Sequence, residues 1–317
     1  MIRLYFLQAF YHLRENPIIT WVSILGTAMA ICMIMVLVIT FQVRLVDCEP
    51  EVNRSRTLYV PYMSVKQKGN SDNESANASM SVRTGRECFR ALSMPEAVTL
   101  ASGVYRVRAS VPSRSKATAD MVQTDEAFWT IFSFHFLSGE AFTKADCDAG
   151  LTRAVLDATT ARRRCGPTEA VGRTVQLDYV DYTVAGVVAD VSMLATAAYA
   201  QIWVPYTAAG AEAMSWQNDT MGPMHAIILA RSSADFDAIR EETELLRKKY
   251  NDGLQDVEVF YRGQPDTQLA YLYRRWYAEP DVPGVMLRYA IVVIILLLVP
   301  AVNLSGMTLS RLLLFGN

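Results

Sequence analysis

The amino-acid sequence predicts an α+β domain flanked by two transmembrane helices. Each end of the 317-residue chain holds a long apolar segment without a charged residue, and 51% of all residues are hydrophobic. Between these segments, strand-like and helix-like patterns interleave without the regular alternation that a parallel βαβ sheet produces. Together these observations indicate a folded α+β block between two membrane spans.

The first predicted span covers residues 18–43. No charged residue occurs from Asn16 to Val43, and a helix of that length extends about 42 Å, more than the roughly 30 Å of a hydrocarbon core. A cleaved signal peptide is the alternative. It fits poorly, because the apolar run is too long and the region before it sets only Arg3 and Arg14 against Glu15.

Residues 1–17 precede this span and carry apolar side chains at helical spacing. Leu4, Leu7, Phe10 and Tyr11 fall on one side of a helix. This pattern favours a short amphipathic helix that lies in the membrane interface. An aromatic-rich extension of the span itself is the alternative.

The second predicted span covers residues 289–310, again without a charge. Its aliphatic run from Ile291 to Val299 favours membrane insertion by about 3–5 kcal/mol. Pro300 lies inside the segment, and helices in lipid tolerate an internal proline better than soluble helices do. The length of the segment argues against a buried core helix.

Two spans place both chain ends on one side of the membrane and the block between them on the other side. Because a domain of this length crosses largely regardless of its loop charges, we expect the block outside the cytoplasm. The predicted organisation is an interfacial helix (1–17), a first span (18–43), an extracytoplasmic core domain (44–288), a second span (289–310) and a cytoplasmic end (311–317).

The block holds a series of predicted strands, helices and loops. They are a strand over 57–66, a polar loop over 67–81, a short helix over 94–102, a helix that Gly166 ends, a hairpin over 175–191 with its turn at 178–181, buried strands at 201–206 and 225–230, a helix over 233–250, a strand at 257–261 and a helix over 266–277. The helix over 233–250 has the clearest pattern, with a capping box formed by Ser232 and Asp235.

Neither catalytic nor nucleotide-binding motifs occur in the sequence. There is no GxxxxGK[ST] phosphate loop, no GxSxG, no HExxH and no glycine-rich dinucleotide turn. The histidines, His12, His135 and His225, are far apart, and no Lys/Arg-rich run suggests nucleic acid. The spans hold no Asp, Glu, Lys, Arg or His, which argues against ion-coupled transport through them. We therefore expect neither an enzyme nor a cofactor on this chain.

Four cysteines fall in the block, and a fifth, Cys32, falls in the first span. In an oxidising compartment the four could form two disulfides in any of three pairings, which the sequence does not choose between. Free buried thiols are the equal alternative. The four candidates are Cys48, Cys88, Cys147 and Cys165.

Several stretches resemble MacB-type ABC-transporter permeases, which have an extracytoplasmic core domain and an FtsX-like membrane part. The stretches that carry the resemblance, in the same order as in the family, are ENP before the first span, AFWTIFSFHFLSGEAFTKAD (Ala127 to Asp146), TARRRCGPTEAVGRTVQLD, YTVAGVVADVS, AQIWVPY and NLSGMTLSR. Each stretch is weak by itself, and their common order makes the match specific.

The resemblance implies mechanotransmission in the bacterial inner membrane, with the large domain in the periplasm. In this family a separate cytoplasmic ATPase binds the ATP, and the permease helices carry its motion to the outer domain. The implied partners are that ATPase, a second permease copy as a homodimer or pair, a periplasmic adaptor and the lipid bilayer, with no nucleic acid.

The sequence departs from the family after Arg311. There the family continues with a charged segment, a coupling helix and two more spans, whereas this sequence reads LLLFGN. We therefore expect a chain that is incomplete at its C-terminus. The rival hypothesis is a sensory receptor with a ligand-binding domain between two spans. It predicts a heptad-bearing helix after the second span, which NLSGMTLSRLLL fits badly.

Overall fold

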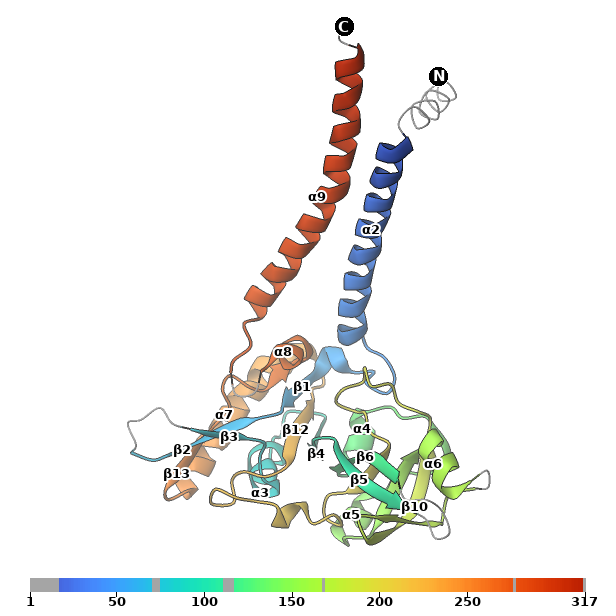
Figure 1. Ribbon diagram of the computed structural model, residues 1–317. Coiled ribbons are helices and arrows are strands. Elements are labelled where there is room, and N and C mark those ends of the chain that lie inside the picture. The colour runs from blue at the N-terminus through green and yellow to red at the C-terminus, as the bar shows by residue number, and fades with distance from the viewer. Residues whose placement is uncertain (1–16, 70–74, 111–116, 167–168, 276–277, 316–317) are drawn as a thin grey trace. The chain divides into compact units, whose positions relative to one another are not determined.

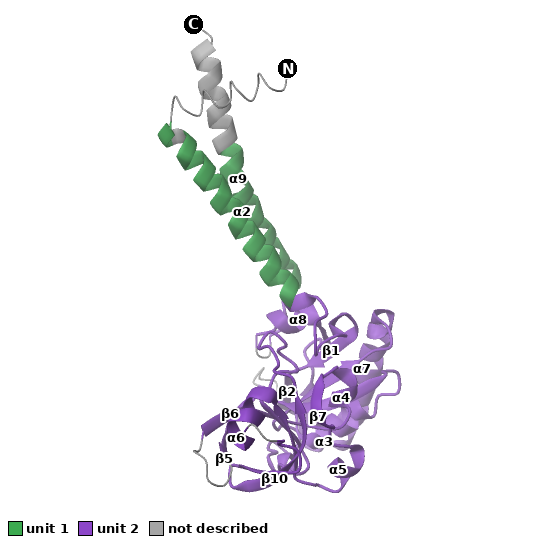
Figure 2. Ribbon diagram, turned by 90° about the vertical axis from the view of Figure 1, so that its right-hand side faces the viewer, with its two compact units in different colours: residues 1–43, 281–317 green, residues 44–280 purple. Residues whose placement is uncertain are grey.

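The computed structural model describes residues 17–69, 75–110, 117–166, 169–275 and 278–315. The chain divides into two compact units (Figure 2). The helical unit comprises Met1–Val43 and Asp281–Asn317, and the central unit comprises Arg44–Pro280. The predicted interfacial helix lies outside the described residues, apart from Pro17.

The helical unit consists of two long helices, α2 (Pro17–Leu45) and α9 (Val282–Phe315). The segments Thr20–Leu45 and Val282–Val302 are long and apolar enough to cross a membrane. Most of their large apolar side chains are exposed, as lipid-facing side chains would be. The rings of Phe41 and Tyr289 approach to 5.6 Å between centroids.

Helix α9 begins before the second span that the sequence predicts. The carboxylate of Asp281 accepts a hydrogen bond of 3.0 Å from the backbone N–H of Gly284, which is the contact of an N-cap residue. Because this cap starts the helix at Val282, Arg288 lies inside α9. The span predicted from hydropathy begins only at residue 289, after this charge.

In its described residues, the central unit contains three β-sheets. Their strand orders are β14-β1-β12-β4, β7-β10-β8-β11-β6-β5-β9 and β13-β2-β3. In Figure 1, the three-stranded sheet and α7 lie together on the left of this unit, and β5, β6, β10 and α6 lie on its right. Its strands and helices are β1 (Thr57–Val60), β2 (Met63–Gln67), β3 (Ala76–Ala78), α3 (Val82–Gly85), β4 (Ala97–Ser102), β5 (Tyr105–Ser110), β6 (Ala117–Thr124), α4 (Phe128–Ile131), β7 (Phe136–Gly139), α5 (Lys144–Asp148), β8 (Arg153–Asp157), α6 (Ala158–Cys165), β9 (Thr174–Leu177), β10 (Val180–Val188), β11 (Ile202–Pro205), β12 (Met224–Leu229), α7 (Phe236–Gly253), β13 (Val257–Phe260), β14 (Asp266–Thr267) and α8 (Gln268–Tyr273), with short helical turns η1 (Arg54–Arg56), η2 (Arg86–Arg90), η3 (Ala211–Ala213) and η4 (Ser233–Asp235).

The seven-stranded sheet separates two hydrophobic clusters. Along β11, Ile202 and Val204 belong to one cluster and Trp203 to the other, as the two-residue period of a strand requires. The cluster around Trp203 is aromatic, and the ring centroids of Trp203 and Phe134 lie 5.2 Å apart. The sheet mixes parallel and antiparallel pairs, which confirms the predicted α+β class.

A third cluster fills the space beside α7. Ile239, Thr243 and Tyr250 are the core-facing positions of this helix, and all three are buried. The capping box of Ser232 and Asp235 is present at η4, one turn before α7. The sequence prediction for this helix and for its cap is confirmed.

The predicted hairpin and the helix ended by Gly166 are also confirmed. Strands β9 and β10 pair antiparallel around Asp178 and Tyr179, whose φ angles are 42° and 74°. Two positive φ angles are what a tight type I′ turn needs, because its backbone twist matches that of the strands. Gly166 follows α6 with φ 89°, a conformation that glycine adopts without strain.

The helix predicted over 94–102 is wrong, because residues 97–102 form strand β4. All six residues of β4 pair in register with β12, and five of the six are buried. Such burial on both faces favours β-branched residues such as Val98 and Thr99 in a strand. Tertiary contacts therefore overrode the local helical pattern.

Three other predicted boundaries differ from the structure. The predicted strand at 57–66 is two strands, separated at Pro61, which cannot donate a ladder hydrogen bond. The predicted loop at 67–81 contains β3, which pairs with β2. The helix predicted over 266–277 is limited to α8, because Asp266 and Thr267 pair with β1 as strand β14.

Candidate functional site

The chain enters the central unit through the N-terminal junction, which we define as residues 44–57. Arg54 is its centre, with a side chain that is 0% exposed. The Nε of Arg54 donates to Glu51 Oε2 at 2.6 Å. Its Nη1 and Nη2 donate to the carbonyl oxygens of Val46 and Leu194, each at 2.9 Å. One buried guanidinium thus joins the start of the unit to a loop that lies 140 residues further along the chain.

Glu51 binds the same loop from its other oxygen. Its Oε1 accepts hydrogen bonds from the backbone N–H groups of Ala197 at 2.8 Å and Ala198 at 3.0 Å. A buried ion pair is costly to desolvate unless its remaining polar atoms are hydrogen-bonded. Here both carboxylate oxygens have partners, so the pair and the loop stabilise one another.

The chain leaves the central unit through the C-terminal junction, residues 261–280. Its centre is a second buried pair, Asp266 with Arg274, whose side chains are 4% and 1% exposed. Arg274 donates hydrogen bonds to this carboxylate from Nε and from Nη2, and Nη2 lies 2.8 Å from Oδ1. Its Nη1 and Nη2 also donate to the carbonyl oxygens of Ala278 and Arg262, both at 3.0 Å. Burial raises the pKa of Asp266, and Arg274 partly opposes that shift.

Strand β1 connects the two junctions. It directly follows η1 in the N-terminal junction, and it pairs with β14 of the C-terminal junction, with Tyr59 opposite Asp266. The ring of Tyr59 stacks on Tyr271 of α8 with 4.5 Å between centroids. Gln268 Nε2 donates to the carbonyl oxygen of Arg44 at 2.9 Å. The segments that enter and leave the unit are therefore attached to one strand.

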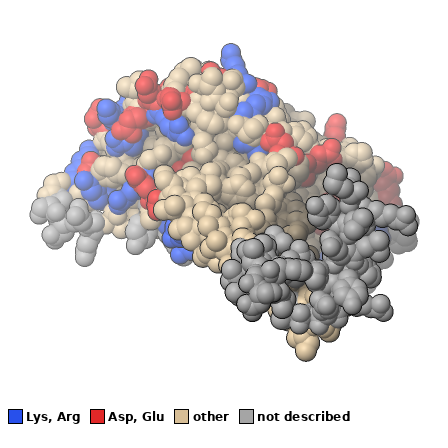
Figure 3. All heavy atoms as spheres, turned by 90° about the horizontal axis from the view of Figure 1, so that it is seen from above, with Lys and Arg blue, Asp and Glu red and all other residues tan. Residues whose placement is uncertain are grey.

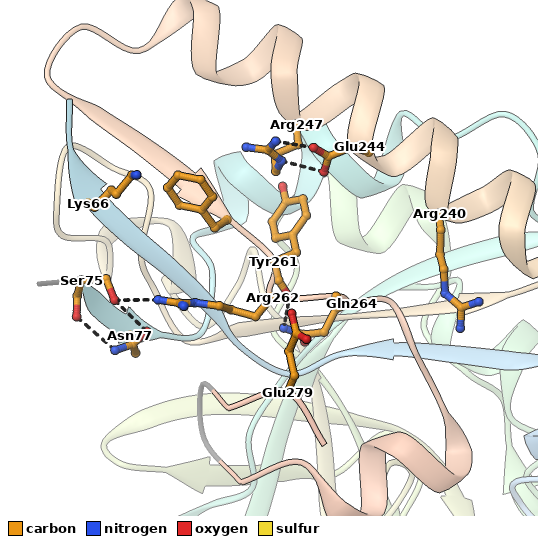
Figure 4. Close-up of a pocket in the computed structure, with 12 residues that line it drawn as sticks. Lys66, Ser75, Asn77, Arg240, Glu244, Arg247, Tyr261, Arg262, Gln264 and Glu279 are labelled. Carbon is orange, nitrogen blue, oxygen red and sulfur yellow. Dashed lines mark hydrogen bonds and ion pairs between the residues drawn. The ribbon is translucent and has the colours of Figure 1, made fainter. Parts of the chain in front are cut away.

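A polar pocket of about 990 Å³ borders the C-terminal junction (Figure 4). Its wall includes the segment from Tyr261 to Gln264, which connects β13 to β14, and one face of α7. The residues that line it are Lys66, Ser75, Asn77, Arg240, Glu244, Arg247, Phe260, Tyr261, Arg262, Gly263, Gln264 and Glu279. A displacement of the C-terminal junction would thus change the shape of this pocket.

Most charged side chains of this pocket form ion pairs or hydrogen bonds with neighbouring side chains. Arg247 forms a two-pronged ion pair with Glu244, and that hydrogen bonding lowers the pKa of Glu244. Arg262 donates from Nε to Ser64 Oγ at 2.9 Å and from Nη2 to Ser75 Oγ at 3.0 Å. Burial holds the pKa of the Tyr261 hydroxyl well above its usual value, so Tyr261 stays protonated. The pocket therefore offers polar binding groups rather than a poised general base.

On one face of the molecule, charged side chains of both signs lie close to one another. Figure 3 shows Lys and Arg beside Asp and Glu on the face that it draws, without a large area of one sign. Ion pairs such as Lys66 with Glu258 at 3.0 Å and Arg86 with Glu212 at 2.7 Å are typical. A surface of this kind does not steer a strongly charged partner over a long distance.

All five cysteines are free thiols in the structure. Cys88, Cys147 and Cys165 are buried in three different hydrophobic clusters, whereas Cys48 is exposed. Burial raises the pKa of Cys88 and of Cys147 to about 12. The fold places Cys88, Cys147 and Cys165 in separate hydrophobic clusters, away from one another.

Among the described residues, no three His, Cys, Asp or Glu side chains come close enough to hold a metal ion. His225 is half-buried, and desolvation lowers its pKa to about 4. Its Nε2 lies 2.8 Å from Ser79 Oγ. Neutral and hydrogen-bonded, His225 has a structural place in the sheet.

Sequence reasoning missed both junctions. Glu51 and Arg54 occur in a polar stretch, EPEVNRSR, that reads as an ordinary exposed turn. Asp266 and Arg274 fall within the helix predicted over 266–277, where charges are common. The only available signal was position, because each pair lies close to the segment that joins the block to a predicted span.

Three solved structures are similar to the central part of this chain. The extracellular domain of the noncanonic ABC-type transporter YknZ from Gram-positive bacteria has 15% identity and a TM-score of 0.43, covering 63% of this chain and 99% of its own. The periplasmic region of MacB from Actinobacillus actinomycetemcomitans has 16% identity and a TM-score of 0.45, covering 64% and 90%. A permease domain from Porphyromonas gingivalis has 15% identity and a TM-score of 0.47, covering 74% and 97%.

The chain matches no curated protein. Residues 20–246, which are more than half of the chain, match the family described as the MacB-like periplasmic core domain. This match includes most of α2, the N-terminal junction and the central unit as far as residue 246, inside α7. The chain therefore belongs to the MacB-like periplasmic core domain family of ABC-transporter permeases.

Proposed function

We propose that this chain is a permease subunit that transmits motion across the bacterial inner membrane to a periplasmic central unit. A separate cytoplasmic ABC ATPase binds and hydrolyses ATP, and the spans in α2 and α9 carry its movement outward. The observation that carries this proposal is the attachment of both junctions to β1. A force that reaches either junction then acts on β1 and its sheet through buried ion pairs.

The energetic requirement is a preference of the ATPase for one arrangement of the permease. A partner shifts an equilibrium between two arrangements only by its difference in affinity for them. The buried ion pairs and strand β1 join the entering and leaving segments inside the central unit, so we expect this unit to respond as a body, as in other interface-driven transitions. A second permease copy, as a homodimer or a pair, and a periplasmic adaptor are the further partners that we propose.

The sidedness of the central unit is tested with its exposed thiol, Cys48. In a Cys32→Ser variant, a membrane-impermeant maleimide is added to cells whose outer membrane alone is permeabilised. We expect modification of Cys48 without lysis, because its side chain is exposed. Cys88, Cys147 and Cys165 are buried and should not react, so the signal reports Cys48. Modification only after lysis would place the central unit on the side of the cell's ATP and would end the proposal.

Coupling is tested with a nitroxide at Met214, an exposed position of the central unit. Each copy carries one label, attached to a cysteine in a Cys32→Ser/Cys48→Ser background, so the measured distance joins two permease copies. With the ATPase that co-purifies from native membranes, we expect different distance distributions in ADP and in ATP with vanadate. Without the ATPase, the distribution should not respond to nucleotide. An unchanged distribution in a complex that hydrolyses ATP would contradict mechanotransmission.

A ligand-binding receptor is the second candidate function, and the pocket of Figure 4 is the observation that favours it. Its volume of about 990 Å³ and its polar lining would accommodate a small charged ligand. Thermal unfolding of the full chain in the presence of inorganic phosphate, citrate or amino acids tests this function. The receptor would be favoured if a ligand raised the unfolding temperature and Arg262→Ala abolished this rise, while the distance distribution of the Met214 label did not respond to nucleotide.

A further inference from the structure

Three exposed apolar side chains gather around the buried guanidinium of the N-terminal junction. Val46, Met193 and Leu194 are 58%, 72% and 47% exposed. Arg54 donates to the carbonyl oxygens of Val46 and Leu194 from the two terminal nitrogens of one guanidinium. The backbones of Val46 and Leu194 are therefore held beside one another by one guanidinium. We call the three exposed residues on these two segments, Val46, Met193 and Leu194, the junction patch.

The junction patch is continuous with the apolar segment of the first helix. Leu45 is the last residue of α2 and of the segment that is apolar enough to cross a membrane, and Val46 follows it directly. The loop that supplies the other two side chains reads VSMLATAAYA from 191 to 200 and contains no charged residue. The acidic residue next to Val46 is Asp47. Its carboxylate accepts hydrogen bonds of 3.0 and 3.1 Å from the backbone N–H and the hydroxyl of Ser55.

We propose that the junction patch inserts into the interfacial layer of the lipid bilayer. Exposed methionine and leucine are unfavourable in water, and an apolar loop becomes favourable at the boundary between head groups and acyl chains. Arg54 ties the carbonyl group of Leu194 to that of Val46, so the loop lies beside the residue at which the chain leaves α2. The proposal rests on the proposed function, since it requires that α2 spans the membrane.

This contact gives the central unit an attachment to the membrane surface in addition to its two chain connections, to α2 and to α9. The added attachment is the loop 191–200, which the buried Glu51 also holds through the N–H groups of Ala197 and Ala198. A third point of contact restricts how the unit can turn relative to the membrane surface. A span that moves would then tilt the central unit as well as translate it.

Site-directed spin labelling of the full chain in nanodiscs tests the proposal. In the Cys32→Ser/Cys48→Ser background, single cysteines replace Met193, Leu194, Met214 or Met29 and carry a nitroxide. Met214 is the matched control, because it is a methionine of the same unit with 49% exposure. Met29, 65% exposed in α2, reports whether the span is in lipid. The readout is the accessibility of each label to oxygen, which concentrates in lipid, relative to a water-soluble nickel complex.

We expect oxygen-to-nickel accessibility ratios at Met193 and Leu194 that are several-fold above the ratio at Met214 and below that at Met29. Ratios equal to that of Met214 would show an aqueous loop and overturn the proposal. Protection from both probes would show that protein, such as a second copy, covers the patch, and would also overturn it. An aqueous Met29 label would instead contradict the proposed function, because α2 would not span the bilayer.

Discussion

The two junctions of the central unit both bury an arginine against a carboxylate, but the arginines bind backbone at very different distances along the chain. Arg54 holds a carbonyl group 140 residues away, in the loop that precedes β11 of the seven-stranded sheet. Arg274 holds carbonyl groups 4 and 12 residues away, beside the polar pocket. The N-terminal junction thus ties distant parts of the unit together, and the C-terminal junction fixes a local turn.

The difference suggests how motion would be divided inside the unit. A displacement that arrives through α2 would act on the loop 191–200 and on the seven-stranded sheet. A displacement that arrives through α9 would act on α8 and on the segment that borders the pocket. Strand β1 is the element that both share, so it sets how far the two responses are coupled.

The largest effect is expected from removing Arg54. Arg54→Met leaves Glu51 buried without its countercharge and should lower the free energy of unfolding by about 4–5 kcal/mol. Urea unfolding of the detergent-solubilised chain, followed by tryptophan fluorescence, measures it. Arg83→Met is the matched control, because Arg83 and Glu87 form an ion pair that is about half exposed, and such pairs contribute less than about 1 kcal/mol. Equal losses in both variants would show that the buried pair has no special role.

Arg274→Met should cost less, about 3 kcal/mol at pH 8. The reason is that burial already raises the pKa of Asp266, so the stranded carboxyl group can take up a proton and become neutral. The loss should therefore shrink between pH 8 and pH 5. A loss that is independent of pH over this range would mean that Asp266 stays ionised, and the contrast between the junctions would disappear.

A hydrogen-bonded contact between two of the sheets, at Asp125, should make the free energy of unfolding depend on pH. Asp125 follows β6 and accepts hydrogen bonds from Thr99 Oγ1 at 2.6 Å and from the N–H of Leu100 at 3.1 Å, both in β4. Burial is the main cause that raises its pKa from 3.8 to about 6, against the attraction of Arg90. The folded state binds the proton of Asp125 more tightly than the unfolded state does. The contribution of Asp125 to the free energy of unfolding therefore falls as pH rises from about 4 to about 6.

The measurement compares Asp125→Asn with the unchanged chain. Relative to the variant, the free energy of unfolding of the unchanged chain should fall by about 2–3 kcal/mol between pH 4 and pH 7. Most of the fall should occur below about pH 6, after which the difference stays constant. A difference that rises with pH would show that the ion pair with Arg90 outweighs burial.

The smallest effect is expected at the direct contact between the junctions. Gln268→Ala removes the hydrogen bond from Nε2 to the carbonyl oxygen of Arg44, which should cost about 1 kcal/mol. The cost stays small because the Oε1 of Gln268 is buried without a hydrogen-bond partner. Gln268→Met, which keeps the volume, serves as the control for packing. If Gln268→Ala left stability intact yet abolished the nucleotide response of the Met214 label, the contact would serve coupling rather than folding.

Local patterns in the sequence were sufficient wherever the neighbours along the chain decide the structure. The capping box of Ser232 and Asp235, the stop at Gly166 and the turn at Asp178 and Tyr179 all depend on residues within a few positions. The prediction of a helix at 94–102 failed because the partner of β4 is β12, more than a hundred residues away. Pairing with that partner outweighed the intrinsic preference of the segment.

The sequence by itself determined the two apolar helices, the α+β class and the family, because hydropathy, periodicity and ordered motifs can be read along the chain. Tertiary structure alone decided the candidate site. Arg54 is an ordinary charged residue until a loop 140 positions away supplies a carbonyl group and covers it. The same holds for Cys88, Cys147 and Cys165, which the fold places in three separate hydrophobic clusters. Burial and long-range partners belong to the folded chain, and no local pattern records them.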